Sequence, residues 1–170
     1  MKLTYNVVPE HALPNLYAIL KAERTLWAIW PEHGESCTEE EFCAAMSVHD
    51  VLVLAGNIDG DPAGVLTLRP FCSDRTLCGE VGLMALRKYF PVAAPLCRSA
   101  LIWCYDNLEL RSMVGRVACQ HHHILSMLGQ VGFSRAALIP GLCWHERKQQ
   151  FVDGWLVTAT RQTVERSMAS

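Results

Sequence analysis

The hydrophobic positions of the chain follow two periods, one typical of helices and one typical of strands. Apolar residues recur at helical spacing in residues 14–30, 95–107 and 121–131, and a further helix opens at Thr38. Apolar segments bounded by turn residues predict strands. The predicted strands are residues 4–8, 51–57, 63–70, 76–86, 111–118, 134–139 and 151–161.

Local signals mark where the helices begin and end. Thr38 and Glu41 form a capping box, in which each residue's side chain bonds the other's main-chain amide. Pro14 and Pro95 suit a first helical turn, where a missing N–H costs little. Gly132 follows the last apolar residue of its helix and suits a left-handed C-terminal cap.

The order of elements predicts the fold class. Residues 58–62, IDGDP, form a turn between two strands and predict a hairpin. The helix 95–107 joins the strand 76–86 to the strand 111–118, which predicts a parallel pair. We therefore expect an α/β protein with a mixed sheet.

Composition narrows the class of protein. A chain of 170 residues with 51% hydrophobic and 19% charged residues suits one compact domain and excludes a disordered chain. The net charge of −2 and the lack of a basic segment argue against nucleic acid as a partner. No apolar segment approaches the ~20 residues that cross a bilayer, so no membrane is expected.

The eight cysteines fit a reduced, cytoplasmic protein. They are irregularly spaced and form no Cys-x-x-Cys motif, and the first residues, MKLTYNVVPEH, lack the apolar core of a signal peptide. Reduced cysteines often serve as small buried hydrophobic residues.

Three consecutive histidines, His121 to His123, follow Cys119 by two residues. Neighbouring side chains on a helix point ~100° apart, so the three imidazoles cannot converge on one ion. Cys119 with one histidine gives two ligands, too few for structural zinc. We expect no metal.

Two motifs carry a resemblance to a known family. Gly132-Phe133 ends a helix and leads into Ser134-Arg135-Ala136-Ala137, and the last strand, FVDGWLVTATR, carries Asp153 near its start and Arg161 at its end. With the element order, these resemble the GNAT acyltransferase superfamily, especially its ribosomal-protein-type N-acetyltransferases, over nearly the whole chain. The resemblance implies one domain over residues 1–170, whose mixed, mostly antiparallel sheet has one splayed parallel strand pair and helices on both faces.

The resemblance also implies a site for acetyl-CoA as co-substrate. In such enzymes the pantetheine arm pairs with the fourth strand and the pyrophosphate lies on the N-terminus of the following helix. His121 takes the place of an asparagine that is common in the family. The implied cofactor-binding residues are Leu83, Met84, Ala85, Leu86, Arg87, Val92, Ala93, Ala94, Cys97, Arg98 and His121.

Glu80 is the implied catalytic residue. Many members carry a glutamate six residues before the end of the fourth strand, and Glu80 lies six residues before Leu86. The even spacing puts both side chains on one face of a strand. Glu80 would take a proton from the acceptor amine. The alternative is that Glu80 forms an ion pair with an arginine at the end of the strand.

The chain departs from the family pattern at two places. The phosphate loop is degenerate, since residues 87–98 contain no glycine. Leu128 stands where many members have a tyrosine that acts as general acid and protonates the departing thiolate. The leading hypothesis is an acetyl-CoA-dependent N-acyltransferase that acts on a small-molecule or protein amine. The alternative is a non-catalytic GNAT-fold protein for binding or assembly, of the kind that some phages encode, which would pair with a second copy or an assembly partner.

Overall fold

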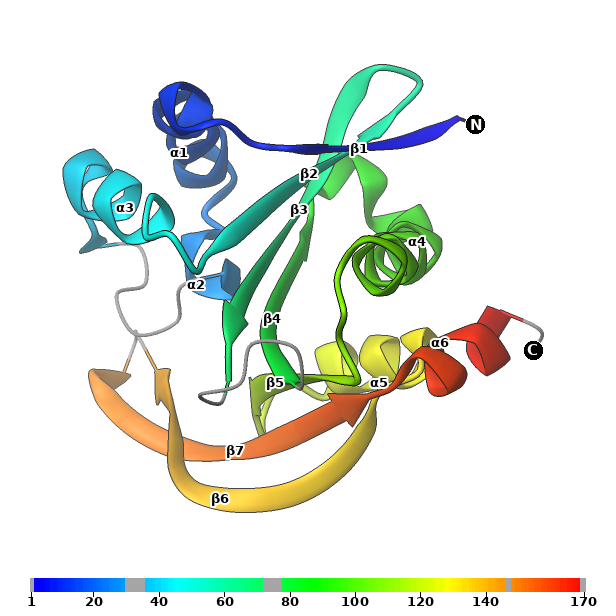
Figure 1. The fold of residues 1–170 in the computed structure, drawn as a ribbon. Helices are drawn as coiled ribbons and strands as arrows, with labels where there is room; N and C mark the ends of the chain where they lie inside the picture. The colour runs from blue at the N-terminus through cyan, green and yellow to red at the C-terminus, as the bar shows by residue number, and fades with distance from the viewer. Residues whose placement is uncertain (1, 30–35, 72–77, 146–147, 169–170) are drawn as a thin grey trace. The chain divides into compact units, whose positions relative to one another are not determined.

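The protein is described by a computed structural model that covers residues 2–29, 36–71, 78–145 and 148–168 (Figure 1). Within these ranges the strands form one sheet in the order β1-β2-β3-β4-β5-β7-β6. The pairs β1–β2, β2–β3, β5–β7 and β6–β7 are antiparallel, and β4–β5 is parallel. The predicted class is confirmed: an α/β protein whose mixed, mostly antiparallel sheet contains a parallel pair.

The strands are β1 (Leu3–Val7), β2 (Leu52–Ile58), β3 (Asp61–Pro70), β4 (Cys78–Ala85), β5 (Ser112–Ala118), β6 (Ser134–His145) and β7 (Gln150–Ala159). The α-helices are α1 (Leu13–Glu23), α2 (Leu26–Ile29), α3 (Glu39–Met46), α4 (Ala93–Asn107), α5 (His122–Val131) and α6 (Arg161–Met168). The 3-10 helices with described bounds are η1 (Glu10–Ala12) and η3 (Arg87–Val92). No helix in the described part of the chain is both long and apolar enough to cross a membrane.

The chain forms two compact units. The first comprises Met1–Arg69 and Val81–Pro91, and the second comprises Pro70–Glu80 and Val92–Ser170. Strand β4 contributes its first three residues to the second unit and the rest to the first. The expectation of one domain over residues 1–170 stays a prediction.

In the first unit, the hairpin of β2 and β3 turns more tightly than predicted. Asp59 and Gly60 have φ of 52° and 96°, the pair of positive values that a two-residue type I′ turn requires. The register closes with Ile58 opposite Asp61. Asp61 and Pro62 are therefore strand residues and not part of the turn.

The prediction of a single helix over residues 14–30 is wrong within the described residues, and Trp30 lies outside them. Arg24 has φ 56°, a left-handed conformation that ends α1. The N–H of Thr25 then donates to the carbonyl of Leu20 at 3.0 Å, which closes the helix end. A second short helix, α2, follows at once.

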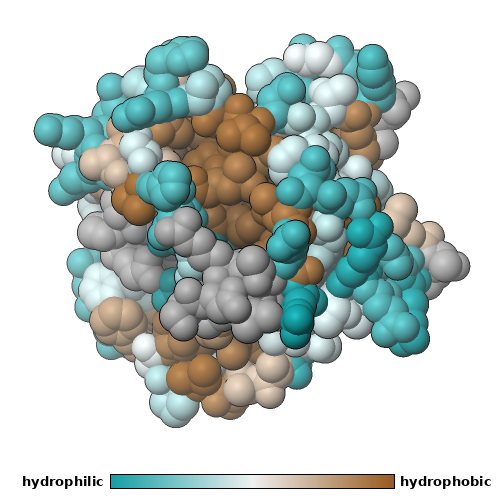
Figure 2. Space-filling model, in the orientation of Figure 1, coloured by the Kyte–Doolittle hydropathy of each residue, from teal (hydrophilic) through white to brown (hydrophobic). Residues whose placement is uncertain are grey.

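The core of the first unit lies between helices α1, α2 and α3 and strands β2 to β4. It includes fully buried Leu20, Leu26 and Phe42, with Val65 from β3 and Met84 from β4. Hydrophobic residues gather over the strands of this unit in Figure 2, whereas α3 carries hydrophilic residues. The amphipathic pattern of the sequence therefore places the helices on the sheet.

In the second unit helices α4, α5 and α6 pack on one another, and the Tyr105 hydroxyl of α4 donates to the carbonyl of Ala159 on β7 at 2.9 Å. Gly132 ends α5 with φ 100°, as predicted. A Cβ at Gly132 would lie 2.6 Å from the carbonyl oxygen of Thr163, so the glycine also permits the close approach of α6.

Helix α6 was not predicted, and Arg161, expected at the end of the last strand, is its first residue. Thr160 and Thr163 bond each other's main-chain amides through their hydroxyl groups, which turns the chain into a helix. The Arg161 guanidinium pairs with Asp106 at 2.8 Å and Glu165 at 2.7 Å. These bonds hold Arg161 at the surface of the second unit.

Candidate functional site

The parallel ladder between β4 and β5 is short. Its register joins Cys78 to Ser112, Gly79 to Met113 and Glu80 to Val114. Beyond these pairs β4 continues to Ala85 and β5 to Ala118. On its other side β5 pairs with β7 from Met113 to Ala118. Glu80 therefore stands at the last pair of the ladder.

Glu80 forms an ion pair with Arg116 on the neighbouring strand. Arg116 Nε donates to Glu80 Oε1 at 2.5 Å, and the two side chains are 24% and 23% exposed. This pair matches the alternative that was predicted for Glu80. The ion pair uses one carboxylate oxygen and leaves the other as an acceptor. The catalytic role of Glu80 is therefore compatible with the ion pair and stays a prediction.

The predicted pantetheine-binding segment, Leu83 to Leu86, belongs to the first unit. Met84 and Ala85 are buried, and Met84 packs in the core beneath the helices. Leu86 packs against the same core and donates its N–H to the carbonyl of Ala63 at 2.8 Å. The amide of Leu86 is therefore already bonded to β3.

Arg87 is bonded to the end of helix α1. Its N–H donates to Glu23 Oε2 at 3.1 Å, and its guanidinium donates to the Glu23 carbonyl at 3.3 Å. The guanidinium also lies 3.8 Å from the Glu23 carboxylate. A phosphate at Arg87 would have to compete with Glu23 for the same cation.

The first turn of α4 lacks side-chain features that would repel an anion. Val92 is its N-cap residue and makes no side-chain capping bond, and the turn carries no acidic residue. Val92 also ends the 3-10 helix η3, which runs directly into α4, so the amides of Ala93 and Ala94 are the main-chain donors of the first turn. Pro95 offers none.

Two predicted residues further along α4 have other partners. Cys97 is buried, and this burial raises the pKa of its thiol to about 12. Arg98 Nη1 donates to the carbonyl of Ser167 at 2.7 Å and to that of Gln130 at 3.4 Å. Arg98 thus holds the C-terminal ends of α5 and α6.

His121 is the N-cap residue of α5 and makes no side-chain capping bond. Its ring contacts that of His123 edge to face, with 6.0 Å between centroids. Burial lowers the pKa of His121, and the nearby His123 and His145 add to the effect. Its neutral form is therefore favoured near pH 7, so His121 brings a hydrogen-bonding ring and little positive charge.

The predicted site residues are divided between the two compact units of the chain. Leu83 to Arg87 lie in the first unit, and the α4 turn, Glu80 and His121 lie in the second. Arg116 was not among the predicted site residues. Its signal was a single arginine inside the otherwise uncharged strand of residues 112–118.

Among the described residues, no three His, Cys, Asp or Glu side chains are grouped so that they could hold a metal ion. Of the three adjacent histidines, His122 and His123 are exposed and His121 is half-buried.

Known proteins resemble this chain in fold and not detectably in sequence. No family model matches the chain, and no curated protein matches it. Among solved structures, the spermidine N-acetyltransferase from Vibrio cholerae, in complex with CoA and spermine, matches with TM-score 0.77 and 13% identity, over 96% of this chain and 98% of that one.

Two further solved structures agree. The protein yncA from Salmonella typhimurium, solved with its cofactor acetyl-CoA, has TM-score 0.70 and 14% identity, over 95% of each chain. An acetyltransferase of the GNAT family from Streptococcus pneumoniae has TM-score 0.67 and 17% identity, over 94% of this chain and 99% of that one. From its first described strand to its last, the chain has the fold of the GNAT acetyltransferases.

Proposed function

We propose that the protein is an acetyl-CoA-dependent N-acyltransferase that acetylates an amine. The observation that carries the proposal is the agreement of the fold, over nearly the full length of both chains, with acetyltransferases solved with CoA or acetyl-CoA. Fold alone does not fix function, so the chemistry must be supported by the residues of this chain.

The α4 turn supports a site for the pyrophosphate of acetyl-CoA. The amides of Val92, Ala93 and Ala94 lie at the positive end of a 15-residue helix. Small side chains at positions 93 and 94 let an anion approach the main chain. This arrangement replaces the glycine-rich loop of the family with main-chain donors at the helix start.

The remaining predicted contacts fit this proposal unequally. Leu83, Met84 and Ala85 are proposed to offer main-chain groups to the pantetheine arm, whereas Leu86 and Arg87 have amides bonded elsewhere. Cys97 and Arg98 are proposed to contribute through packing of α4. His121 would donate or accept one hydrogen bond.

Acetyl transfer in this proposal needs one base. The amine nitrogen of the acceptor attacks the thioester carbon, and the proton that the nitrogen loses passes to Glu80, directly or through water. The C–S bond then breaks, and the thiolate of CoA leaves and takes a proton from solvent. The products are the N-acetyl amine and CoA.

The acceptor is proposed to be a primary amine of a small molecule or of a protein. One solved neighbour of the same fold holds an amine, spermine, in complex with CoA, which supports this class of acceptor. The alternative, a non-catalytic protein for assembly, has less support, because the neighbours named above are acetyltransferases or hold acetyl-CoA.

The cytoplasm is the proposed compartment. None of the seven cysteines in the described ranges forms a disulfide, which suits a reducing environment.

Thermal melting with acetyl-CoA tests the proposal. A ligand at 100 times its dissociation constant adds ~2.7 kcal/mol to the unfolding free energy, which raises Tm by about 5–10 °C for a chain of this size. Acetylation of a panel of amines, followed by mass spectrometry, tests the chemistry. Glu80→Gln should keep the Tm shift and lose turnover. A wild-type protein with neither a shift at millimolar acetyl-CoA nor an acetylated amine would contradict the proposal.

A further inference from the structure

We propose that Arg116 is a positioning residue for acyl transfer: its guanidinium holds Glu80 Oε1 so that Oε2 is presented to the acceptor amine. The inference rests on the proposed function. It adds a residue that neither sequence motif singles out.

The register of the sheet makes this pair a built feature and not a chance surface contact. Glu80 is the register partner of Val114, and paired residues on neighbouring strands point to the same face. Arg116 lies two residues after Val114 on β5, so its side chain also points to that face. The two side chains meet diagonally across the parallel ladder.

The neighbours of Arg116 on the other side are apolar. Arg116 is paired with Leu156 on β7, and Leu156 is paired with Ala137 on β6. These register partners on β7 and β6 bring no acidic side chain, and Arg116 is bonded to Glu80 across the parallel ladder. Removing one partner of a partly buried ion pair leaves the other charge without compensation, so we expect the two side chains to act as a unit.

The exposure of the pair suits a role in chemistry. About a quarter of each side chain is exposed, so a substrate can reach the carboxylate while the surrounding sheet limits its rotation. An arginine stays charged and donates only, so it can fix the carboxylate without taking the proton that Glu80 must accept. A carboxylate held in one orientation avoids the loss of entropy that a mobile base would suffer in the transition state.

The test is a double-mutant cycle on kcat for acetylation of an amine that the wild-type protein accepts. Arg116→Gln should lower kcat about 10- to 100-fold and change KM for acetyl-CoA less than about twofold. Arg116→Lys keeps the positive charge but lacks the planar guanidinium, so its kcat should lie between those of the wild type and Arg116→Gln. The double variant Arg116→Gln/Glu80→Gln should be no slower than Glu80→Gln alone.

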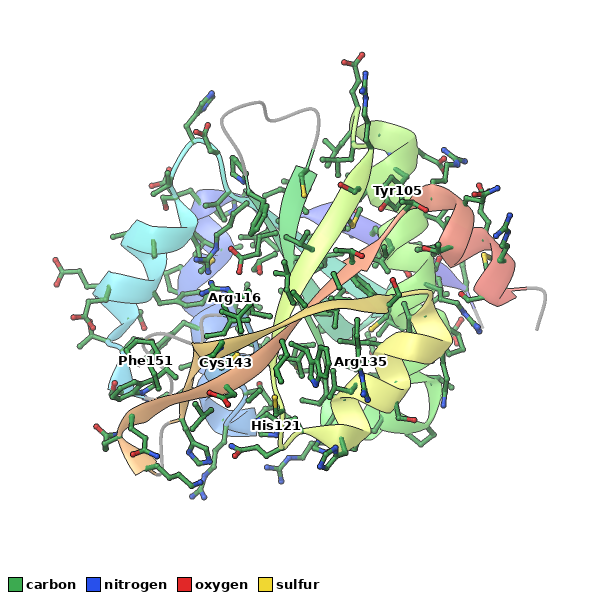
Figure 3. All side chains as sticks on the ribbon, turned by 90° about the horizontal axis from the view of Figure 1, so that it is seen from below. Tyr105, Arg116, His121, Arg135, Cys143 and Phe151 are labelled. Atoms are coloured by element: carbon green, nitrogen blue, oxygen red, sulfur yellow. The ribbon has the colours of Figure 1, made fainter. Side chains whose placement is uncertain are left out.

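Arg135→Gln is the matched control. Arg135 lies on β6 in the same unit, but it is exposed and stacks over the ring of Trp155, 5.2 Å from its centroid. In Figure 3 Arg135 lies on the side of α5 and Arg116 lies on the other side of the strands. Loss of Arg135 should leave kcat unchanged, whereas a general effect of losing a positive charge would lower it in both variants.

The outcomes separate the inference from the function on which it rests. A wild-type protein that acetylates no amine overturns both. An active wild type in which Arg116→Gln keeps kcat, or in which the losses from Arg116→Gln and Glu80→Gln multiply in full, overturns only the role of Arg116. If Arg116→Gln fails to fold, the cycle is measured with Arg116→Lys, and the same two results decide.

Discussion

Helices α3 and α4 begin in opposite ways. At the start of α3, the N–H of Glu41 donates to the Thr38 hydroxyl at 3.2 Å, and the N–H of Thr38 donates to Glu41 Oε2 at 2.8 Å. The first turn of α3 also carries three glutamates, which complement the positive end of the helix. At the start of α4, Val92 makes no side-chain cap and the first turn has no acidic residue.

The difference indicates which helix start is suited to bind an anion. The sequence satisfies the amides of α3 with its own side chains, so α3 has little to offer a ligand. At the start of α4 no side chain takes that role, and a helix start without a side-chain cap favours an anion. The comparison therefore ties the proposed phosphate site to α4 and makes α3 its internal control.

The largest expected effect comes from giving α4 a cap like that of α3. Val92→Asp would accept a hydrogen bond from the N–H of Ala94 and place a negative charge where we propose the pyrophosphate. We expect acetyl-CoA to bind about 100-fold more weakly, because a charged hydrogen bond contributes ~1.5–3 kcal/mol. Isothermal titration calorimetry measures the affinity.

The unliganded Val92→Asp protein should melt at the same temperature as the wild type or higher, since an acidic cap stabilises a helix. Unchanged affinity in a folded Val92→Asp protein would remove the α4 turn from the binding site.

The converse change removes the cap of α3. Thr38→Ala loses the bond from Glu41 and should lower the unfolding free energy by ~1 kcal/mol. For a chain of this length Tm falls by about 2–4 °C. Differential scanning calorimetry measures the change, and acetyl-CoA affinity, measured in parallel, should stay the same. A Thr38→Ala protein that bound acetyl-CoA more weakly would show that the two helix starts are not independent.

The smallest expected change in acetyl-CoA affinity comes from adding an amide donor to the first turn of α4. Pro95→Ala restores an amide donor to the first turn, which now lacks one at this position. If the phosphate lies there, the added donor should tighten acetyl-CoA binding about threefold, equal to ~0.65 kcal/mol. Weaker binding would mean that the fixed backbone of the proline matters more than the missing donor.

Much of the fold follows from local signals in the sequence. Thr38 with Glu41 and Gly132 marked helix ends correctly, because each acts through its immediate neighbours. The break at Arg24 was not predicted, since a left-handed arginine has no signal comparable to glycine. Helix α6 was missed because its cap is a reciprocal pair of threonines and Val164 is its one buried residue among those described.

The candidate site was less predictable, because its contacts join distant residues. Glu80 and Arg116 are 36 residues apart, and only the register of β4 and β5 brings them together. Glu23 and Arg87 are 64 residues apart, and their bonds involve a residue that the family resemblance assigned to the cofactor. Periodicity and motif spacing carry no information on such pairs.

The guanidinium of Arg98 donates to the carbonyls of Gln130 and Ser167, so in the proposed site the main chain of Val92, Ala93 and Ala94 would recognise the phosphate. An amide is common to every residue except proline. A binding site built only from main-chain amides requires no particular residue types, so it leaves no sequence motif. Other small residues could replace those at positions 93 and 94 without loss of a donor. A protein of this design matches solved structures along almost its entire length while no family model detects it.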